Sequence, residues 1–538
     1  MTSEFSDYLE QVIAESTSCV GFIGIRGASK TWTAQFVLEM LAQRGWHPLI
    51  IDVKGEDETL HIPAKGDQAR SLRAHGLEPR GWSVKYLHPN FPLGMETIPI
   101  EFELVPLSLR MLSYGHFRSI EGFLSPSEAR DLFDAYFTAG GPEAKLDEII
   151  GRLLREGRKG GRLLGLLTSG LFADESVLEP KNFVELVEKH DFTVLSTAYF
   201  KPSSRDLARF VLNVILDNLM GYLIQEVEDS RLVVHFRELR EVAPRAGAMG
   251  SQWHLRSRIE SFVTFLRQTK TALTRVFYEV QNVSSVPKTL LDNTQAVFVH
   301  PFNLREEEQR RELAKYFPIP ESVVHAVIPL RKTIPGKWIF LSKSGFASWV
   351  NSPPPLSLRI PEPKTPEEAR EVSKMIRELV PRRKLAEEFN AARRRYKAWL
   401  AKARYLREED EEADFEEELP PPETLVLNTI TKKFALFMKA FQFADLDGKE
   451  RFVFNLVLPG ALLRKKLGAR AQAFLFSSTI EKMLRRRETR LQLRIAGFRF
   501  FSDTEGTLMG ELDVSRYKAH MRAHGHRYDR IVKEFEES

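Results

Sequence analysis

The sequence predicts an α/β protein followed by a small α+β domain at its C-terminal end. Three observations support this fold class. Short apolar strands alternate with helices over residues 1–360, a glycine-rich loop follows the first of these strands, and an acidic, proline-rich segment separates a basic C-terminal part. A strand, a glycine-rich loop and a helix in this order form the start of a P-loop core. We therefore expect a P-loop fold over residues 1–360.

Composition places the chain among soluble globular proteins. It has 538 residues, of which 43% are hydrophobic and 28% charged, enough for two to four domains. We identify no apolar run of the roughly 20 residues that cross a bilayer, and the first residues lack the basic start of a signal peptide. We expect a cytoplasmic protein with no membrane partner.

The number of cysteines and the net charge exclude some kinds of site and are compatible with others. Cys19 is the only cysteine, which excludes a disulfide framework and a cysteine-based zinc site within one chain. We interpret it as a small core residue. The formal net charge of +5 is a mild basic excess that is compatible with nucleic acid and does not establish it.

The loop at residues 24–31 reads GIRGASKT and follows the apolar run at 19–23. In the pattern G-x-x-x-x-G-K-[ST], glycines let backbone N–H groups point at phosphates, the lysine neutralises charge and the hydroxyl holds Mg²⁺. Ser29 stands where the last glycine is expected. Thr31 is the candidate metal ligand. The candidate ATP-binding residues are Gly24, Gly27, Ala28, Ser29, Lys30 and Thr31.

The surroundings of the loop favour a nucleotide site over an ordinary turn. A helix with apolar residues on one face follows it, and a second strand at 47–52 completes about one βαβ repeat. Two interpretations of the Ser29 variant stay open at this point, a modified nucleotide site and the remnant of one.

Later strands bring polar residues to the same edge of the predicted sheet. A strand at 192–196 precedes a helix that opens at 202–204, and the next strand, 231–236, ends in Arg237 and Glu238. Another strand, 275–281, ends in Gln281. Ligands in open α/β sheets bind at the carboxyl ends of the strands, so Lys30, Glu238 and Gln281 are expected to converge. Taken alone, Gln281 is better explained as an ordinary turn residue.

Three further segments complete the domain organisation. Residues 100–185 form a mostly helical insertion whose cationic loop at 155–162 is either a solvated turn or a contact for a polyanion. Residues 361–422 are a charged helical segment that ends in an acidic and triple-proline linker.

Residues 423–538 form the basic C-terminal domain. Its clusters at 464–466 and 485–487 suit either a nucleic-acid or oligomer surface or a solvated face. Three histidines at 520, 524 and 526 lack the acidic or thiol partners of a metal site.

Together, these pieces resemble the HerA/FtsK superfamily of ring-forming DNA-translocating ATPases, its HerA-like branch most closely, over residues 15–355. The segments at 50–56 (IIDVKGE), 233–244 (VVHFRELREVAP) and 267–270 (RQTK) carry the resemblance together with the loop. It implies a RecA-like core that binds ATP and Mg²⁺, a hexameric ring with nucleotide between subunits, and double-stranded DNA as partner. The implied catalytic residues are Glu238, Gln281, Arg267 and Lys270.

The chain departs from the family pattern at three chemical positions. Ser29 adds a Cβ at a cost of about 1–2 kcal/mol if its φ is positive. Arg237 replaces the aspartate that supports Mg²⁺; it repels the metal and is able to pair with phosphate. Lys270 replaces an arginine and loses its two-pronged contact. Nucleotide binding is expected to survive these changes better than hydrolysis.

We therefore predict a HerA-like ATPase in double-stranded DNA translocation, packaging or processing, with altered and weak hydrolysis. The alternatives are an inactive pseudo-ATPase that acts as a structural or regulatory subunit, and a P-loop enzyme whose partner supplies the missing acid. The loop begins too early for the N-terminal β-barrel by which HerA proteins dock a nuclease, so a simple DNA-end-resection helicase is not expected. A nuclease or another DNA-processing protein remains a candidate partner.

Overall fold

The computed structural model describes residues 19–155, 161–225, 231–245, 251–268, 274–331, 336–360 and 365–413, and the strand residues 451–455, 498–502 and 508–513. The chain divides into two compact units, Met1–Arg407 and Glu408–Ser538. Of the second unit the structure describes an antiparallel sheet in the order β15 (Arg451–Asn455), β17 (Leu508–Asp513) and β16 (Phe498–Ser502). The basic clusters and the three histidines predicted there lie outside the described residues.

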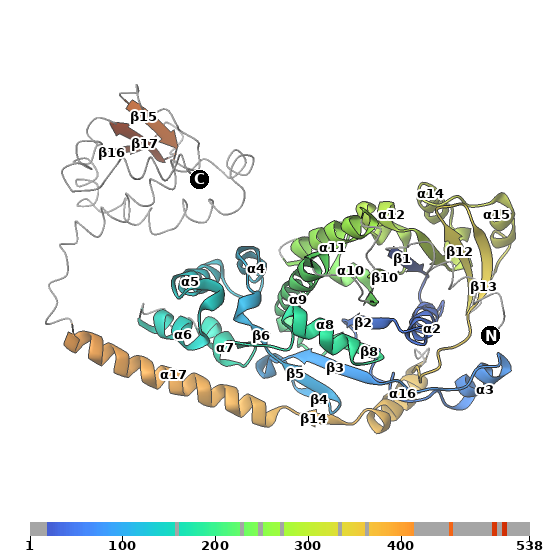
Figure 1. Cartoon of the computed structure of the whole chain (residues 1–538), viewed down its shortest axis with the longest axis horizontal. Coiled ribbons are helices and arrows are strands. Elements are labelled where there is room, and N and C mark those ends of the chain that lie inside the picture. The colour runs from blue at the N-terminus through green and yellow to red at the C-terminus, as the bar shows by residue number, and fades with distance from the viewer. Residues whose placement is uncertain are drawn as a thin grey trace. The chain divides into compact units, whose positions relative to one another are not determined.

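A ten-stranded, mostly parallel sheet forms the centre of the first unit (Figure 1). Its order is β13-β12-β11-β1-β10-β9-β2-β8-β3-β5, and only β12 and β13 run antiparallel to their neighbours. The strands are β1 (Cys19–Ile23), β2 (His47–Asp52), β3 (Val84–Pro89), β5 (Phe102–Val105), β8 (Phe192–Ser196), β9 (Leu232–Phe236), β10 (Arg275–Val280), β11 (Ala296–Val299), β12 (Lys337–Ser342) and β13 (Ala347–Asn351).

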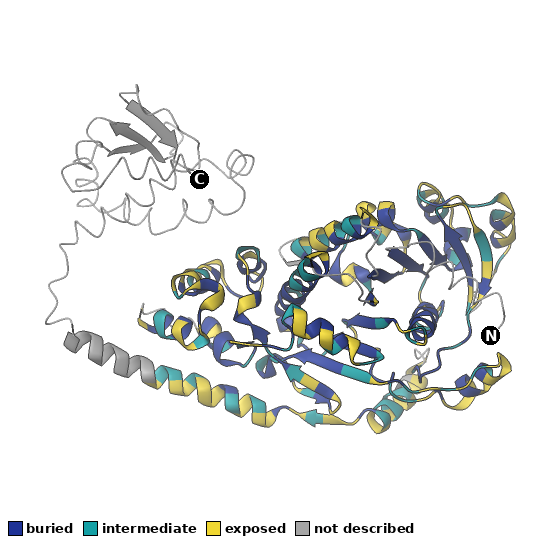
Figure 2. Cartoon of the chain, viewed as in Figure 1, coloured by how far each residue is buried: buried dark blue, intermediate teal, exposed yellow. Residues whose placement is uncertain are grey.

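The centre of this sheet confirms the predicted strands. The strand that precedes the glycine-rich loop, β1, lies between β10 and β11, and β10 separates β1 from β9. This is the arrangement of a P-loop core with an additional strand between the loop strand and the strand that ends in acidic residues. Strands β1, β2, β9 and β10 are buried along nearly their whole length (Figure 2), which explains their continuous apolar runs.

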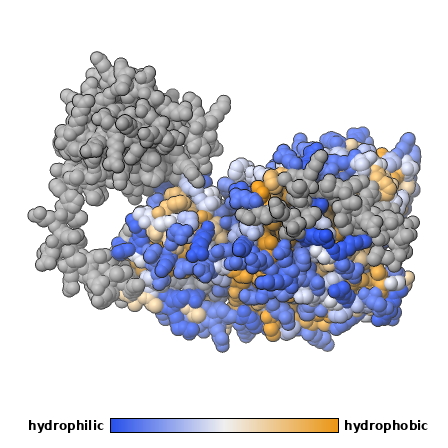
Figure 3. Space-filling view, viewed as in Figure 1, coloured by the Kyte–Doolittle hydropathy of each residue, from blue (hydrophilic) through white to orange (hydrophobic). Residues whose placement is uncertain are grey.

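Helices cover both faces of the sheet. The crossover from β1 to β2 runs through α2 (Lys30–Ala42), whereas those from β8 to β9 and from β9 to β10 run through α9 (Arg205–Gln225) and α11 (Ser251–Gln268) in the opposite direction along the sheet. Right-handed crossovers therefore place α2 on one face and α9 and α11 on the other (Figure 1). The described surface in Figure 3 is mostly hydrophilic with scattered apolar spots.

Helix α2 differs from the expected one-sided helix because ten of its residues are buried, among them Gln35 and Glu39. Its second face is covered by residues 355–359, which we call the strap. Gln35 Nε2 donates to Ser357 Oγ at 2.7 Å, and Ser357 N donates to Glu39 Oε1 at 3.0 Å. The strap follows α2 by more than 300 residues in the chain. The sequence around α2 therefore gave no sign that a second face of this helix is covered.

The insertion is helical from Tyr114 onward, while its first part adds β5 to the main sheet. Ser125 and Glu128 form a reciprocal capping box at the start of α5, with Pro126 in the first turn. The cationic loop lies mainly outside the described residues. The elements here are β4 (Thr97–Pro99), β6 (Leu107–Ser108), α4 (Tyr114–Ser119), α5 (Pro126–Thr138), α6 (Leu146–Arg155), α7 (Gly161–Thr168), β7 (Phe172–Ala173) and α8 (Pro180–Glu188).

Within the part of the chain that the structure describes, one helix satisfies the length and hydropathy of a membrane span. The segment Pro202–Gln225 passes this test by composition, and 67% of its most apolar window is buried within the protein. This segment contains α9, which packs between α8 and α11. Its apolar character is therefore accounted for by its position in the core.

The charged segment after the sheet is interrupted near Pro381. The strand β14 (Arg382–Lys384) separates α16 (Pro366–Leu379) from α17 (Ala386–Ala413) and pairs with β4. The first unit thus continues to Arg407 and includes much of the segment expected between 361 and 422. The remaining helices are α3 (Gly66–Ala74), α10 (Leu239–Val242), α12 (Lys288–Asn293), α13 (Pro301–Arg305), α14 (Glu307–Ala314) and α15 (Glu321–Val327).

Candidate nucleotide site

The loop at residues 24–31 joins β1 to α2 at the carboxyl edge of the sheet. Gly24 N donates to Val280 O at 3.0 Å, which fixes the start of the loop against the end of β10. A Cβ on Gly24 would lie 2.8 Å from Cη2 of the buried Trp338, and Gly27 has a φ of +77°. These two positions require glycine, one for space and the other for backbone conformation.

The N-terminus of α2 is built to receive an anion. Its first N–H groups have no acceptor within the helix, and the helix dipole adds a partial positive charge there. Ser29, the N-cap, makes no side-chain capping hydrogen bond, and the first turn contains no acidic residue. Lys30, which is buried at 8% exposure, adds a cation at the same place. The loop therefore combines the features that bind phosphate.

Backbone strain is concentrated at this site. Among the described residues, the only two non-glycine residues with positive φ are Ser29 at 60° and Glu238 at 51°. Ser29 thus adopts the left-handed conformation in which its Cβ costs energy, as the sequence analysis anticipated. Strained residues of this kind cluster at functional sites.

Replacing Ser29 by glycine is expected to raise the free energy of unfolding by about 0.5–1 kcal/mol, since relief of the left-handed strain exceeds the entropy cost of glycine. Ser29→Ala keeps the Cβ and loses no capping bond, so it is the matched control and should bring no gain. Urea unfolding measures both variants. Equal free energies of unfolding for Ser29→Gly and Ser29→Ala would show that the left-handed conformation of Ser29 carries no strain.

The carboxyl end of β9 brings Glu238 to the loop. Lys30 Nζ lies 3.6 Å from Glu238 Oε1, and Lys54 Nζ lies 2.7 Å from the same atom. Burial would lower the pKa of Lys54, but its hydrogen bond to Glu238 raises it, so Lys54 stays charged. The predicted convergence of Lys30 and Glu238 is present. The sequence pointed to Lys54 only as part of the IIDVKGE segment and not as a site residue. The structure places it in the site, beside Glu238.

Gln281 follows the last residue of β10 and is exposed. Its backbone oxygen accepts a hydrogen bond from Asn303 Nδ2 at 2.8 Å, while Asn303 Oδ1 accepts from Ile25 N at 3.0 Å. The buried Asn303 thus ties the P-loop to the end of β10. Sequence reasoning missed Asn303, because it comes from a short helix 22 residues beyond Gln281 and belongs to no recognised pattern.

The side chain of Arg237 does not face the loop as a free cation. It is buried at 2% exposure, and it donates to Asp57 through Nε at 2.8 Å and through Nη2 at 2.6 Å. Its Nη1 also contacts Glu279 Oε1. Two carboxylates therefore occupy the donors of Arg237 that were considered for a contact with phosphate.

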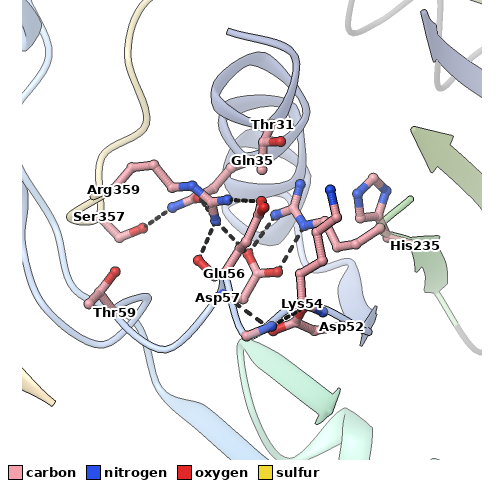
Figure 4. Close-up of polar contacts among 12 residues, drawn as sticks. Thr31, Gln35, Asp52, Lys54, Glu56, Asp57, Thr59, His235, Ser357 and Arg359 are labelled. Carbon is pink, nitrogen blue, oxygen red and sulfur yellow. Dashed lines mark hydrogen bonds and ion pairs between the residues drawn. The ribbon is translucent and has the colours of Figure 1, made fainter. Parts of the chain in front are cut away.

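A buried cluster of ion pairs surrounds Arg237, which contacts both Asp57 and Glu279 of β10. Figure 4 shows Asp57 of this cluster together with Glu56 and Arg359. Arg359 of the strap donates to Asp57 Oδ1 at 3.0 Å and to Glu56 Oε2 at 2.6 Å. Burial would raise the pKa of Asp57, but Arg237 and Arg359 hold it below its ordinary value. The cluster links β9, β10, the loop after β2 and the strap.

Asp52, at the end of β2, has a different environment. Its Oδ1 accepts hydrogen bonds from Lys54 N at 2.9 Å and from Gly55 N at 2.8 Å, which shape the turn that presents Lys54. Burial, followed by the nearby charge of Asp57, raises the pKa of Asp52 to about 7. Asp52 is therefore a turn-forming residue beneath the site.

Arg267, one of the two candidate residues for contact between subunits, does not lie beside the loop of its own chain. Arg267 is exposed near the end of α11, where Nη1 makes long contacts of 3.4 Å to Asp292 O and Asn293 Oδ1. These residues precede β11, at the amino edge of the sheet, opposite the loop. Lys270 lies outside the described residues.

The residues present fit ATP with Mg²⁺, except that Arg237 stands where the family pattern has an aspartate that supports the metal. Thr31 is half-buried in the first turn of α2 and its Oγ1 donates to Glu279 Oε2 at 3.0 Å. In the described part of the chain, no group of three or more His, Cys, Asp or Glu side chains is arranged to hold a metal ion. Mg²⁺ is usually held by one or two side chains, water and substrate phosphates, and Thr31 is a loop residue able to supply a side-chain oxygen.

No protein-family model and no curated protein matches the chain. Three distant structural matches are the genome packaging NTPase B204 from Sulfolobus turreted icosahedral virus 2 (8% identity, TM-score 0.29, 63% of this chain and 98% of that one), VirB4 of Thermoanaerobacter pseudethanolicus (16%, 0.35, 66% and 91%) and the bacterial conjugative coupling protein TrwB (12%, 0.37, 64% and 88%).

The identification of the core depends on its own geometry, namely the strand order around β1 and the loop that leads into α2. B204 and TrwB were solved with ATP-gammaS and with a GTP analogue, respectively. The described core is an additional-strand P-loop fold.

Proposed function

We propose that the protein is a cytoplasmic HerA-like ATPase that acts on double-stranded DNA in translocation, packaging or processing, and that it hydrolyses ATP slowly. The observation that carries the proposal is the meeting of Lys30 and Glu238, 3.6 Å apart, at the carboxyl edge of a sheet with an additional strand. A lysine from a P-loop and a carboxylate from the strand beyond β10 are the two groups that such ATPases need for phosphate binding and water activation.

The chemistry assigned to each residue follows from its position. The N–H groups of the loop and Lys30 Nζ bind the β- and γ-phosphates of ATP. Glu238 orients the attacking water, and Gln281, at the end of β10, contacts the γ-phosphate or that water. Mg²⁺, when bound with ATP, neutralises charge on the phosphates, and Thr31 is the residue of the loop that holds it.

Slow turnover is supported by the state of Glu238. Its Oε1 is engaged by Lys54 at 2.7 Å and by Lys30 at 3.6 Å, and its backbone is strained. Bound phosphate competes for Lys30, but Lys54 must also release or share the carboxylate before it can orient water. This requirement adds a step that a free glutamate lacks.

DNA and the ring are supported by the resemblance of residues 15–355 to HerA-like translocases. Arg267 lies at the sheet edge opposite the loop, which suits a residue that reaches the nucleotide of a neighbouring subunit in a hexamer. Lys270 is proposed for the same contact. A nuclease or another DNA-processing protein is the candidate partner.

The test is ATP hydrolysis and binding by the full chain with and without long duplex DNA, together with the mass of the assembly. We expect DNA to increase a slow basal rate. Glu238→Gln should remove turnover and retain bound ATP, because the amide keeps the shape of the side chain but cannot act as a base. Glu241→Gln, an exposed carboxylate on α10, is the matched control.

The outcomes separate the two main candidate functions. Absence of turnover with duplex DNA, at temperatures where the protein is folded, would overturn the translocase and leave the pseudo-ATPase, for which the ion-paired Arg237 is the favouring observation. DNA-stimulated turnover that is lost in Glu238→Gln would instead exclude the pseudo-ATPase.

A further inference from the structure

We infer that Glu279, a buried residue of β10, has taken over the task of the missing acidic residue at position 237 and positions Thr31 for Mg²⁺. In a P-loop ATPase, the loop hydroxyl and an acidic residue at the end of another strand hold the metal together. Here that acidic residue is supplied by the additional strand. The inference rests on the proposed nucleotide site and concerns which residue supports its metal.

The strand register explains how Glu279 reaches this place. Tyr278 pairs with Phe236 of β9, so the next residue of β10 lies beside the next residue of β9, which is Arg237. On its other side, Glu279 pairs with Phe22 of β1, one residue before Ile23 at the end of that strand. Glu279 is therefore the acidic residue of β10 that lies between the loop strand and position 237.

The two oxygens of Glu279 serve different partners. Oε1 accepts a hydrogen bond from His235 Nε2 at 2.9 Å and contacts Arg237 Nη1. Oε2 accepts from Thr31 Oγ1 at 3.0 Å. A hydroxyl that donates its proton to a carboxylate keeps its lone pairs for a cation, so this contact orients Thr31 as a metal ligand.

The charge of Glu279 has a buried partner, because the Arg237 guanidinium lies against its carboxylate. Arg237 is itself balanced by Asp57, so it does not present an unpaired charge to a cation near Thr31.

Compared with the family pattern, the acidic side chain is thus supplied by β10 instead of by position 237 at the end of β9. The arginine stands where the acid is expected, and the acid stands on β10 and reaches the loop hydroxyl. A purely structural ion pair would require only the contact between Glu279 and Arg237. The second contact, to Thr31, is the one that points to a ligand.

The experiment compares the affinity of the full chain for ATP-gammaS with Mg²⁺ and with EDTA. We expect Mg²⁺ to strengthen binding by the native protein, and Glu279→Gln to lose roughly 10- to 100-fold of that gain, as for other residues that orient metal ligands. Its affinity in EDTA should stay unchanged. Because the readout is the ratio of two affinities, a general loss of binding does not imitate it.

Matched variants separate positioning from damage to the fold. Glu56→Gln breaks the ion pair with Arg359 at the far end of the cluster without touching Arg237 or Thr31, so it should retain the gain from Mg²⁺. Thr31→Val should lose the gain, Thr31→Ser should keep it, and Thr31→Val combined with Glu279→Gln should lose no more than either alone. If Glu279→Gln does not fold, Glu279→Asp keeps the charge but withdraws the carboxylate from Thr31, and the same loss is expected.

Two results would overturn the inference. One is a folded Glu279→Gln, or Glu279→Asp in its place, that keeps the full gain from Mg²⁺, and the other is a native protein whose binding does not respond to Mg²⁺. Neither result would contradict the proposal that the loop binds nucleotide. Failure of the native protein to bind ATP-gammaS under either condition would reject the proposed function and this inference with it.

Discussion

Lys30→Ala is expected to weaken the binding of ATP-gammaS roughly 10- to 100-fold, because Lys30 is the buried cation of the loop and a charged hydrogen bond to phosphate contributes about 1.5–3 kcal/mol. Hydrolysis, where present, should be lost with it. Cys19 gives a direct readout, since it is the only cysteine and lies in β1, the strand that leads into the loop.

Burial raises the pKa of the Cys19 thiol to about 12, so it should react with a thiol reagent only when the core opens. A ligand that binds only the folded state slows this reaction by the factor by which it stabilises that state. ATP-gammaS should protect Cys19 in the native protein and in Lys181→Ala, an exposed lysine on α8, but not in Lys30→Ala. Equal protection in Lys30→Ala would show that the ligand binds elsewhere.

Arg237→Asp, which restores the residue type expected at this position, should destabilise the protein rather than repair it. The new carboxylate would lie beside the buried Asp57 and Glu279, which would lose their common partner. Removing one member of a buried ion pair costs about 3–5 kcal/mol, and this is the loss expected for Arg237→Met. Arg237→Asp should lose more. Urea unfolding of the full chain measures both.

The control is Arg240→Met, an exposed arginine three residues further on, which should leave stability nearly unchanged. The pH dependence follows from the lowered pKa values of Asp57 and Glu279. Their contribution is complete above the ordinary values of 3.8 and 4.5 and is lost as the pH falls toward the lowered ones. The difference between native protein and Arg237→Met should therefore persist from pH 8 to about pH 5 and shrink at lower pH. A stable Arg237→Asp would contradict the ion cluster.

These predictions depend on features that the sequence revealed to different degrees. The strands at 19–23, 47–52, 192–196 and 231–236 were predictable, because each is a short apolar run next to a loop or helix signal. The strand β3 and the joining of β5 to the main sheet were not recognised. Their patterns are mixed, and β5 lies within a segment that otherwise reads as helical.

The same division applies to the site. The glycine-rich loop identified Lys30, Thr31 and the anomaly at Ser29, because a P-loop is a contiguous pattern. Asn303 and Glu279 were missed, because each acts on the loop from another element. Glu279 in particular reads as an interruption of an apolar strand until the register of β10 is known.

By itself, the sequence determined the P-loop, several of the core strands and the change at position 237, since all are local patterns of residue type and spacing. Only the tertiary structure decided what that change means. Arg237 is buried between Asp57 and Glu279, and Glu279 reaches Thr31, because parallel pairing places residues from distant segments side by side at the carboxyl edge of the sheet. The charge of a single side chain is legible in sequence, but its partners are fixed only when the strands are in register.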